Sequence, residues 1–179
     1  MINRASDRRN CICRVAVALV LLLGVASIPA TIHAASPGRS LDTSGAAPRA
    51  VEDTTATSVE RDYAHAWKSL VSALEANHAE LLNENFTGSA RQHWQQAIEV
   101  QKQSGLSRRI IDHGHSLHVT FYSLDGSALQ AEDVADLEIE YRDGSKVLSS
   151  EHVKLRYLVL LTPAENSWKI RILEELPSI

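Results

Sequence analysis

The chain has 179 residues, of which 44% are hydrophobic, so it is long enough and apolar enough to bury the core of one domain. Its formal net charge is −4, and the first 14 residues alone carry +3, so the remainder carries −7. An acidic remainder argues against nucleic acid as a partner, because nothing in it offsets phosphate repulsion. Both cysteines, Cys11 and Cys13, lie in the leading segment, which excludes disulfides and thiolate chemistry from the rest of the chain.

Residues 1–34 have the pattern of a signal peptide. An arginine-rich start precedes an apolar run over 15–28, which at about 14 residues is shorter than the ~20 that a membrane-spanning helix needs. Ile32-His33-Ala34 before Ala35 predicts a cleavage site. We therefore expect an exported protein, located in a periplasm or outside the cell. The alternative is an uncleaved leader that anchors the chain, and membrane contact is expected only in that case.

Residues 35–57 are predicted to be a flexible linker. They are rich in Pro, Gly, Ser and Thr and hold few large apolar residues, so burial could not offset the entropy of ordering them. The folded domain is expected over 58–179.

Two amphipathic helices are predicted at the start of this domain. The first runs from about Val59 to Asn83, where apolar residues recur at helical spacing, and Thr57 with Glu60 forms a candidate capping box. The second runs from about 89 to 103, and Gly105 is its candidate C-cap.

Four strands follow, each with apolar and polar residues in alternation. They are expected at about 108–124, 129–141, 146–161 and 168–174, with a bulge or kink at Gly114. Helices that precede a run of antiparallel strands are typical of an α+β fold. Here the two N-terminal helices would pack on a curved antiparallel sheet of four or more strands, giving a cone-like shape.

Loop lengths suggest a register for each of the last two hairpins. A four-residue loop over 163–166 would pair apolar residues on one face of the final hairpin, namely Leu161 with Trp168, Val159 with Ile170, and Tyr157 with Ile172. In the middle hairpin, a two-residue loop would set Glu140 opposite Val147, whereas a three-residue loop would set Tyr141 there. The second option keeps apolar residues together and is favoured, with a bulge further along.

The order and lengths of these elements resemble the nuclear transport factor 2-like superfamily, the cone-shaped fold that includes polyketide cyclases of the SnoaL type. The resemblance covers about 59–177 and includes the final strand, Ser167-Trp168-Lys169-Ile170-Arg171-Ile172. It implies that the sheet wraps around a pocket whose mouth the first helix covers. Some members are isomerases, cyclases or dehydratases that place an Asp and a Tyr or His in the pocket, and many others are non-catalytic binding or assembly modules.

Polar side chains on the predicted strands offer several candidate sites. In an extended segment His113 and His115 would share one face, with His118 on the other, so the first two are candidate metal ligands. The spacing names no third ligand, and no cofactor or metal is expected. The candidates for acid–base catalysis are Asp112, His118, Tyr122, Glu138 and Glu140.

The alternation of the two glutamates with apolar residues is also typical of a solvated face, paired across strands with Lys154 and Arg156. Six aromatic residues are expected to line a ligand pocket, although such spacing is typical of a core as well: Tyr63, Trp67, Trp94, Phe121, Tyr157 and Trp168.

The favoured function is an exported non-catalytic module that binds a small apolar ligand or a protein partner, with a homodimer through the sheet as one form. The alternatives are a small isomerase or hydro-lyase acting in the cone pocket, and a membrane-anchored assembly component if the leader is retained. The non-catalytic module and the enzyme are distinguished by whether any of His118, Tyr122, Glu138 or Asp112 faces a buried cavity.

Overall fold

A computed structural model describes residues 38–177. The predicted signal peptide, its cleavage site and both cysteines lie outside these described residues. Among the described residues, no helix combines the length and apolarity needed to cross a membrane.

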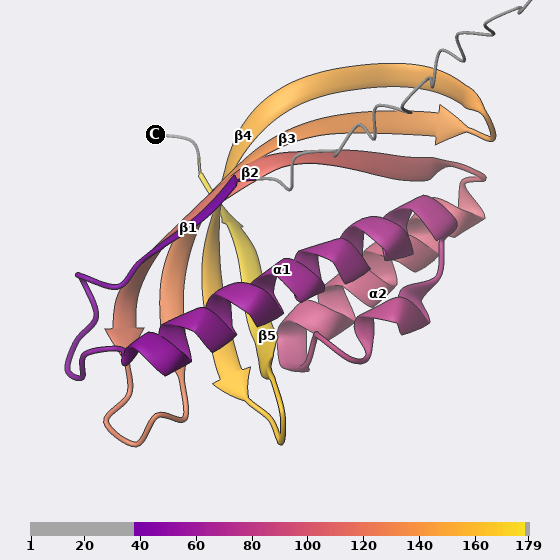
Figure 1. Cartoon of the computed structure of the whole chain (residues 1–179). Coiled ribbons are helices and arrows are strands. Elements are labelled where there is room, and N and C mark those ends of the chain that lie inside the picture. Colours follow the sequence, from indigo (N-terminus) through magenta and orange to yellow (C-terminus); the bar gives the residue numbers. More distant parts are fainter. Residues whose placement is uncertain (1–37, 178–179) are drawn as a thin grey trace, which may run out of the picture. The chain divides into compact units, whose positions relative to one another are not determined.

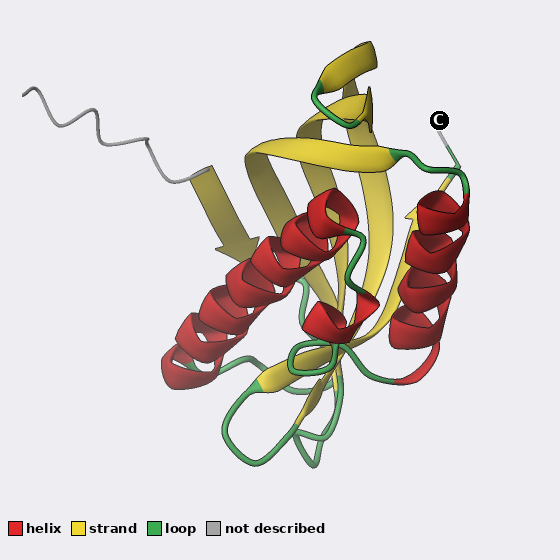
Figure 2. Cartoon of the chain, turned by 90° about the vertical axis from the view of Figure 1, so that its right-hand side faces the viewer, coloured by secondary structure: helices red, strands yellow, loops and turns green. Residues whose placement is uncertain are grey.

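One curved sheet carries two helices on its inner face, as Figures 1 and 2 show. The elements in chain order are β1 (Gly38–Asp42), α1 (Asp53–Ala76), the 3₁₀ helix η1 (Ala79–Leu82), α2 (Gly88–Gln103), β2 (Ser107–Tyr122), β3 (Leu129–Asp143), β4 (Lys146–Pro163) and β5 (Trp168–Leu176). The sheet order is β1-β2-β3-β4-β5. The last four strands form an antiparallel meander, and β1 pairs with β2 in parallel. The predicted α+β fold class is confirmed.

The first strand and the start of α1 occupy residues that were predicted to be a flexible linker, and that prediction is wrong for 38–57. The order of these residues cannot be predicted from composition, because β1 is held by pairing with a strand about 76 residues away. Gly38 lies opposite Gly114. Gly114 has a φ of 153°, and a Cβ there would lie 2.7 Å from the Gly38 carbonyl oxygen. Glycine therefore permits the close approach of the two strands.

Helix α1 begins six residues earlier than predicted and ends seven residues earlier. Thr57 is not a cap, because it lies inside the helix and its hydroxyl donates to the Asp53 carbonyl. The helix stops at Asn77, which adopts a left-handed conformation (φ 55°) and donates its side-chain amide to the Leu106 carbonyl. Helix α2 and the bulge at Gly114 agree with prediction.

Both predicted hairpin registers are wrong. In the last hairpin Pro163 lies opposite Trp168, and a bulge then sets Val159 opposite Leu173 and leaves Ile172 paired with Leu160 on the outer face. In the middle hairpin the loop has two residues, 144–145, so Arg142 lies opposite Val147 before a register shift. In each hairpin the loop occupies other residues than predicted, which changes the pairs next to the turn, and a bulge then shifts the pairs beyond it. The bulge predicted for the middle hairpin is confirmed.

The core lies between the inner face of the sheet and the two helices. Its largest fully buried side chains include Trp67, Tyr63 and Phe86 from the helical half, and Leu129, Leu137 and Leu161 from the sheet. The far ends of β2, β3 and β4 extend beyond this core and curve over the ends of the helices (Figure 1).

Candidate functional site

An open cleft, which we call the aromatic cleft, lies between the inner face of the sheet and the helices. It consists of two hollows, of about 350 Å³ and about 540 Å³, which share Trp94, Tyr157 and Glu175. The smaller is also lined by Trp67, Arg108, Ile110, Leu137, Ile139, Tyr141, Glu151, Val153 and Leu155. The larger lies between α2 and β5 and is also lined by Ser89, Ala90, His93, Leu173 and Glu174. Aromatic and aliphatic side chains form most of the smaller hollow, whereas polar and charged side chains form half of the lining of the larger one.

The charged residues of the aromatic cleft are mainly acidic. Glu151, Glu174 and Glu175 contribute three carboxylates. The one arginine of the lining, Arg108, lies over the ring of Tyr141, with its guanidinium carbon 5.4 Å from the ring centroid. Burial, and then the charge of Glu175, raises the pKa of Tyr157, so its hydroxyl stays protonated as a hydrogen-bond donor. The cleft therefore offers apolar contacts beside negative charges, and it suits a ligand that has both apolar and positively charged groups.

A second polar arrangement, the buried network, crosses the core from α1 to β1. The Tyr63 hydroxyl donates to Asp133 Oδ2 at 2.7 Å, and Nδ1 of His115 lies 2.8 Å from the same oxygen. On its other side, Nε2 of His115 lies 3.4 Å from Asp112 Oδ1. Asp112 Oδ2 in turn accepts a hydrogen bond from Arg39 Nη2 at 2.5 Å. The side chains of His115 and Asp133 are fully buried.

Acidic and basic side chains alternate along this network, and their contacts with one another shift several of their pKa values. Burial of the ring lowers the pKa of His115, but the hydrogen bonds and charges of Asp112 and Asp133 outweigh burial and raise it overall. Burial raises the pKa of Asp112, but His115 and Arg39 outweigh that contribution and lower it overall. Burial, and then the charge of Asp133, raises the pKa of the Tyr63 hydroxyl well above its usual value. The two carboxylates therefore favour the protonated imidazole of His115 over the neutral one.

The raised pKa of His115 predicts a loss of stability on the alkaline side. A histidine whose folded-state pKa is raised contributes stability that is fully present below its unfolded value of 6.5 and is lost as pH rises through the folded value. We expect the free energy of unfolding, measured by urea titration, to fall as pH rises above 6.5. A His115→Gln variant, which cannot titrate, should lack that component, and an equal fall in the variant would contradict the assignment to His115.

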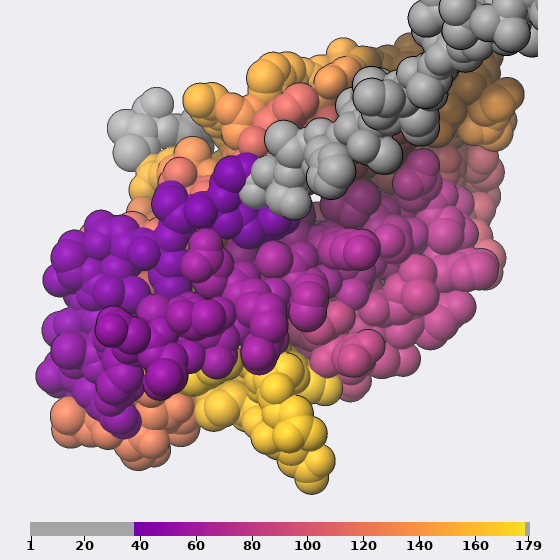
Figure 3. All heavy atoms as spheres, in the orientation of Figure 1, coloured from indigo at the N-terminus to yellow at the C-terminus, as the bar shows by residue number. Residues whose placement is uncertain are grey.

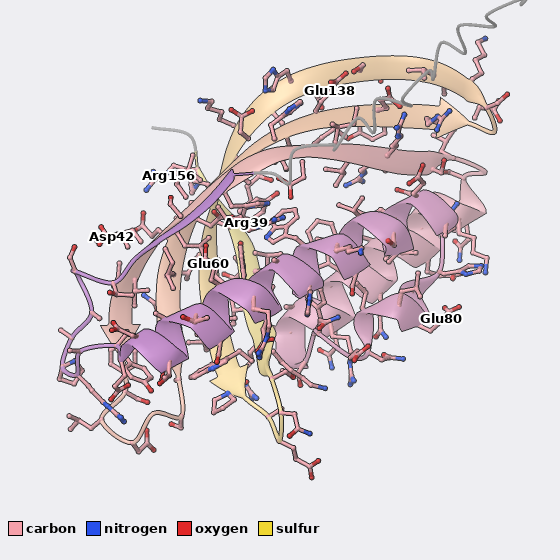
Figure 4. All side chains as sticks on the ribbon, viewed as in Figure 1. Arg39, Asp42, Glu60, Glu80, Glu138 and Arg156 are labelled. Atoms are coloured by element: carbon pink, nitrogen blue, oxygen red, sulfur yellow. The ribbon has the colours of Figure 1, made fainter. Side chains whose placement is uncertain are left out.

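The predicted catalytic candidates do not converge on one cavity. Asp112 joins the buried network, whereas Tyr122 is buried in the core with Arg49 over its ring. Glu138 lies on the outer face of the sheet (Figure 4), where it accepts from Ser150 and lies 3.8 Å from His113. His118 is exposed and its Nδ1 lies 2.8 Å from Asp42 Oδ2.

Glu140 lies 3.6 Å from Arg109 rather than against either predicted basic partner. Those two basic residues do form cross-strand pairs, but with other carboxylates. Lys154 pairs with Asp136, and Arg156 pairs with Glu132. The outer face of β3 and β4 is therefore a solvated ion-paired face, as the alternation indicated.

The two candidate metal ligands point to opposite faces, contrary to prediction. The bulge at Gly114 reverses the alternation, so His115 enters the core while His113 stays outside. There the ring of His113 lies 5.1 Å from that of His152, centroid to centroid, and His152 contacts Asp136. Within residues 38–177, no group of three or more His, Cys, Asp or Glu side chains is placed to hold a metal ion.

Three of the six predicted pocket aromatics line the aromatic cleft, namely Trp67, Trp94 and Tyr157. Tyr63 and Trp168 are core residues. Phe121 does not fit the pocket prediction, because a register shift next to it on β2 leaves its side chain 39% exposed.

Asp133 was not among the candidates, although the sequence holds a signal for it. It lies at the inward position of β3 between Ala131 and Ala135, in a series that otherwise consists of apolar residues. A lone carboxylate at such a position must have a buried partner.

No protein-family model matches the sequence, and no curated protein matches it. Solved structures do match. The intermembrane space region of the chloroplast protein ARC6 aligns with a TM-score of 0.61 and 21% identity, over 73% of this chain and 100% of that one. At this identity the likeness is one of fold.

Two further structures align less closely. A putative scytalone dehydratase from Novosphingobium aromaticivorans has a TM-score of 0.44 and 15% identity, over 66% of this chain and 83% of that one. A putative dehydratase from the NTF2-like family of Streptomyces avermitilis has a TM-score of 0.43 and 9% identity, over 68% of this chain and 99% of that one. Two helices on one face of a curved antiparallel sheet are the architecture that the resemblance implied, and the resemblance is confirmed as one of fold.

Proposed function

We propose that this domain is a binding module of an exported protein, and that the aromatic cleft binds an extended, apolar and positively charged ligand such as a segment of a partner protein. The observation that carries the proposal is the lining of the cleft. Two hollows joined through Trp94, Tyr157 and Glu175 present aromatic rings beside three carboxylates. Aromatic side chains with a polar rim are typical of recognition surfaces. Export is inferred from the leader pattern of residues 1–34.

The shape of the aromatic cleft favours a long ligand over a compact one. The two hollows have only three lining residues in common, so a compact molecule would fill one of them and leave the other empty. An extended segment can place alternate side chains in both hollows and bring lysine or arginine beside Glu151 and Glu175.

A hydro-lyase or isomerase is less well supported by the geometry. Such an enzyme needs its acid and base in contact with the ligand. The buried network contains a suitable imidazole and carboxylate, but the side chains of His115 and Asp133 have no exposed surface and line neither hollow of the cleft. Within the network, Asp133 Oδ2 is contacted by the Tyr63 hydroxyl and by His115 Nδ1, so this contact involves no substrate.

The proposal is tested by peptide binding to the purified full-length protein. The probe is a fluorescent ten-residue peptide in which leucine and lysine alternate, and its partner probe has glutamate in place of lysine. Fluorescence anisotropy should report binding of the lysine peptide and much weaker binding of the glutamate peptide. A Glu151→Lys, Glu175→Lys double variant should bind the lysine peptide about tenfold more weakly or worse, since each rim charge contributes up to ~1 kcal/mol.

The matched control is Glu165→Lys, which reverses an exposed charge in the β4–β5 turn, outside the cleft. It should bind the lysine peptide as the unaltered protein does. Equal binding of both peptides, or an equal loss in the control variant, would show that the cleft does not select its ligand as proposed.

A further inference from the structure

A third hollow, the β1–α1 groove, adjoins the aromatic cleft at Ile110 and has the opposite charge character. It has a volume of about 410 Å³ and runs between α1 and the strands β1 and β2. Its polar lining consists of Arg39, His65, Lys68, Ser72 and Asp112. Figure 3 shows α1 and β1 side by side on the face turned toward the reader, and Figure 4 places Arg39 between them.

We propose that the β1–α1 groove binds a small organic carboxylate with a short apolar chain. The carboxylate would lie between Arg39 on β1 and Lys68 on α1, and the chain would lie along the apolar part of the groove. This site shares only Ile110 with the lining of the aromatic cleft and does not depend on the function proposed for that cleft.

The spacing of the helix residues brings three hydrogen-bond donors to one wall. His65, Lys68 and Ser72 follow one another at intervals of three and four residues, so their side chains lie on one face of α1 over two turns. Arg39 lies on the opposite wall, on a strand that pairs with β2. Donors from a helix and from a strand therefore face the same space.

Asp112 is the one carboxylate that the described residues contribute to the groove, and it is already engaged. Asp112 accepts from Arg39 and lies beside the buried imidazole of His115, so its charge is offset within the protein. Lys68, in contrast, takes part in none of the ion pairs formed within residues 38–177. An anion entering the groove meets one cation with no partner and one that is shared, whereas the chain as a whole carries −4.

Apolar side chains complete the groove and determine the rest of the ligand. Ala64 and Val71 come from α1, and Ile110 comes from β2. A bare inorganic anion would leave these side chains in contact with water, whereas a chain of several methylene groups would cover them, at about 0.8 kcal/mol for each group buried.

The test is calorimetric titration of the full-length protein with sodium octanoate, with acetate, inorganic phosphate and octyltrimethylammonium as comparison probes. Octanoate should bind, acetate and phosphate should bind at least about tenfold more weakly, and the cationic amphiphile should not bind in this groove. Lys68→Glu should lower the affinity for octanoate about tenfold or more. Lys102→Glu, which reverses an exposed lysine on α2, should leave that affinity unchanged.

Three outcomes would overturn the proposal. The first is no measurable heat with octanoate, the second is an equal loss of affinity in the Lys68 and Lys102 variants, and the third is phosphate binding as tight as that of octanoate. Both substituted lysines are exposed. Both variants should therefore fold as the unaltered protein does, and a thermal unfolding curve checks this. Because neither lysine lines the aromatic cleft, the result is independent of peptide binding there.

Discussion

Replacing Asp133 with alanine is expected to lower the free energy of unfolding by about 3–5 kcal/mol, a large part of the 5–15 kcal/mol typical of a domain. The change removes the oxygen to which Tyr63 donates and against which His115 lies. A hydroxyl and an imidazole would then be buried without that partner. Leaving buried polar groups unpaired costs far more than an average hydrogen bond contributes. Chemical denaturation of the purified protein measures the difference.

Asp136→Ala is the matched control, because Asp136 lies on the same strand but on the outer face. It pairs with His152 and Lys154, both of which are largely exposed. Exposed pairs contribute about 0–1 kcal/mol, so this variant should lose no more than that. If the two alanine variants lost similar amounts, the buried network would not stabilise the fold as described.

Replacing Trp67 with alanine is expected to cost about 3–5 kcal/mol as well, for a different reason. Its ring packs 4.4 Å from that of His115, 5.7 Å from Tyr157 and 6.4 Å from Tyr63, centroid to centroid. Truncation would leave a cavity beneath α1, which the surrounding helix and sheet could only partly fill. Urea titration monitored by circular dichroism would report the loss.

Phe121→Ala provides the comparison, because Phe121 and Trp67 were both predicted from the sequence to line the ligand pocket. Since its ring is substantially exposed, its loss should change the free energy of unfolding by less than about 1 kcal/mol. Similar destabilisation by both substitutions would mean that Phe121 is buried in solution, and would favour the pocket predicted from the sequence.

The elements of this fold could be predicted because their apolar periodicities are clear. The stripe from Tyr63 to Leu74 predicts α1, and strict alternation predicts the long strands. The limits of prediction lie where a distant partner decides the conformation. Asn77 ends α1 because its left-handed backbone and its bond to Leu106 terminate a helix that periodicity alone would continue.

The candidate site was harder to predict, because a bulge reverses every face that follows it. Regular strand alternation places His113 and His115 on the same face. The extra residue of the bulge at Gly114 instead directs His115 into the core. The buried network joins residues from α1, β1, β2 and β3, which no local pattern connects. Asp133 alone could have been suspected, as the one charged residue at an inward position of an apolar series.

The parallel pairing of β1 has a consequence for the order in which the domain folds. Strands β2 to β5 are joined to their partners by short turns, so the meander can form through contacts that are local in the sequence. Strand β1 must instead close a loop of about 70 residues, which makes its pairing slow and late. Until it arrives, the edge of β2 remains open to other chains. We therefore expect the domain to be open to aggregation through the edge of β2 during that interval.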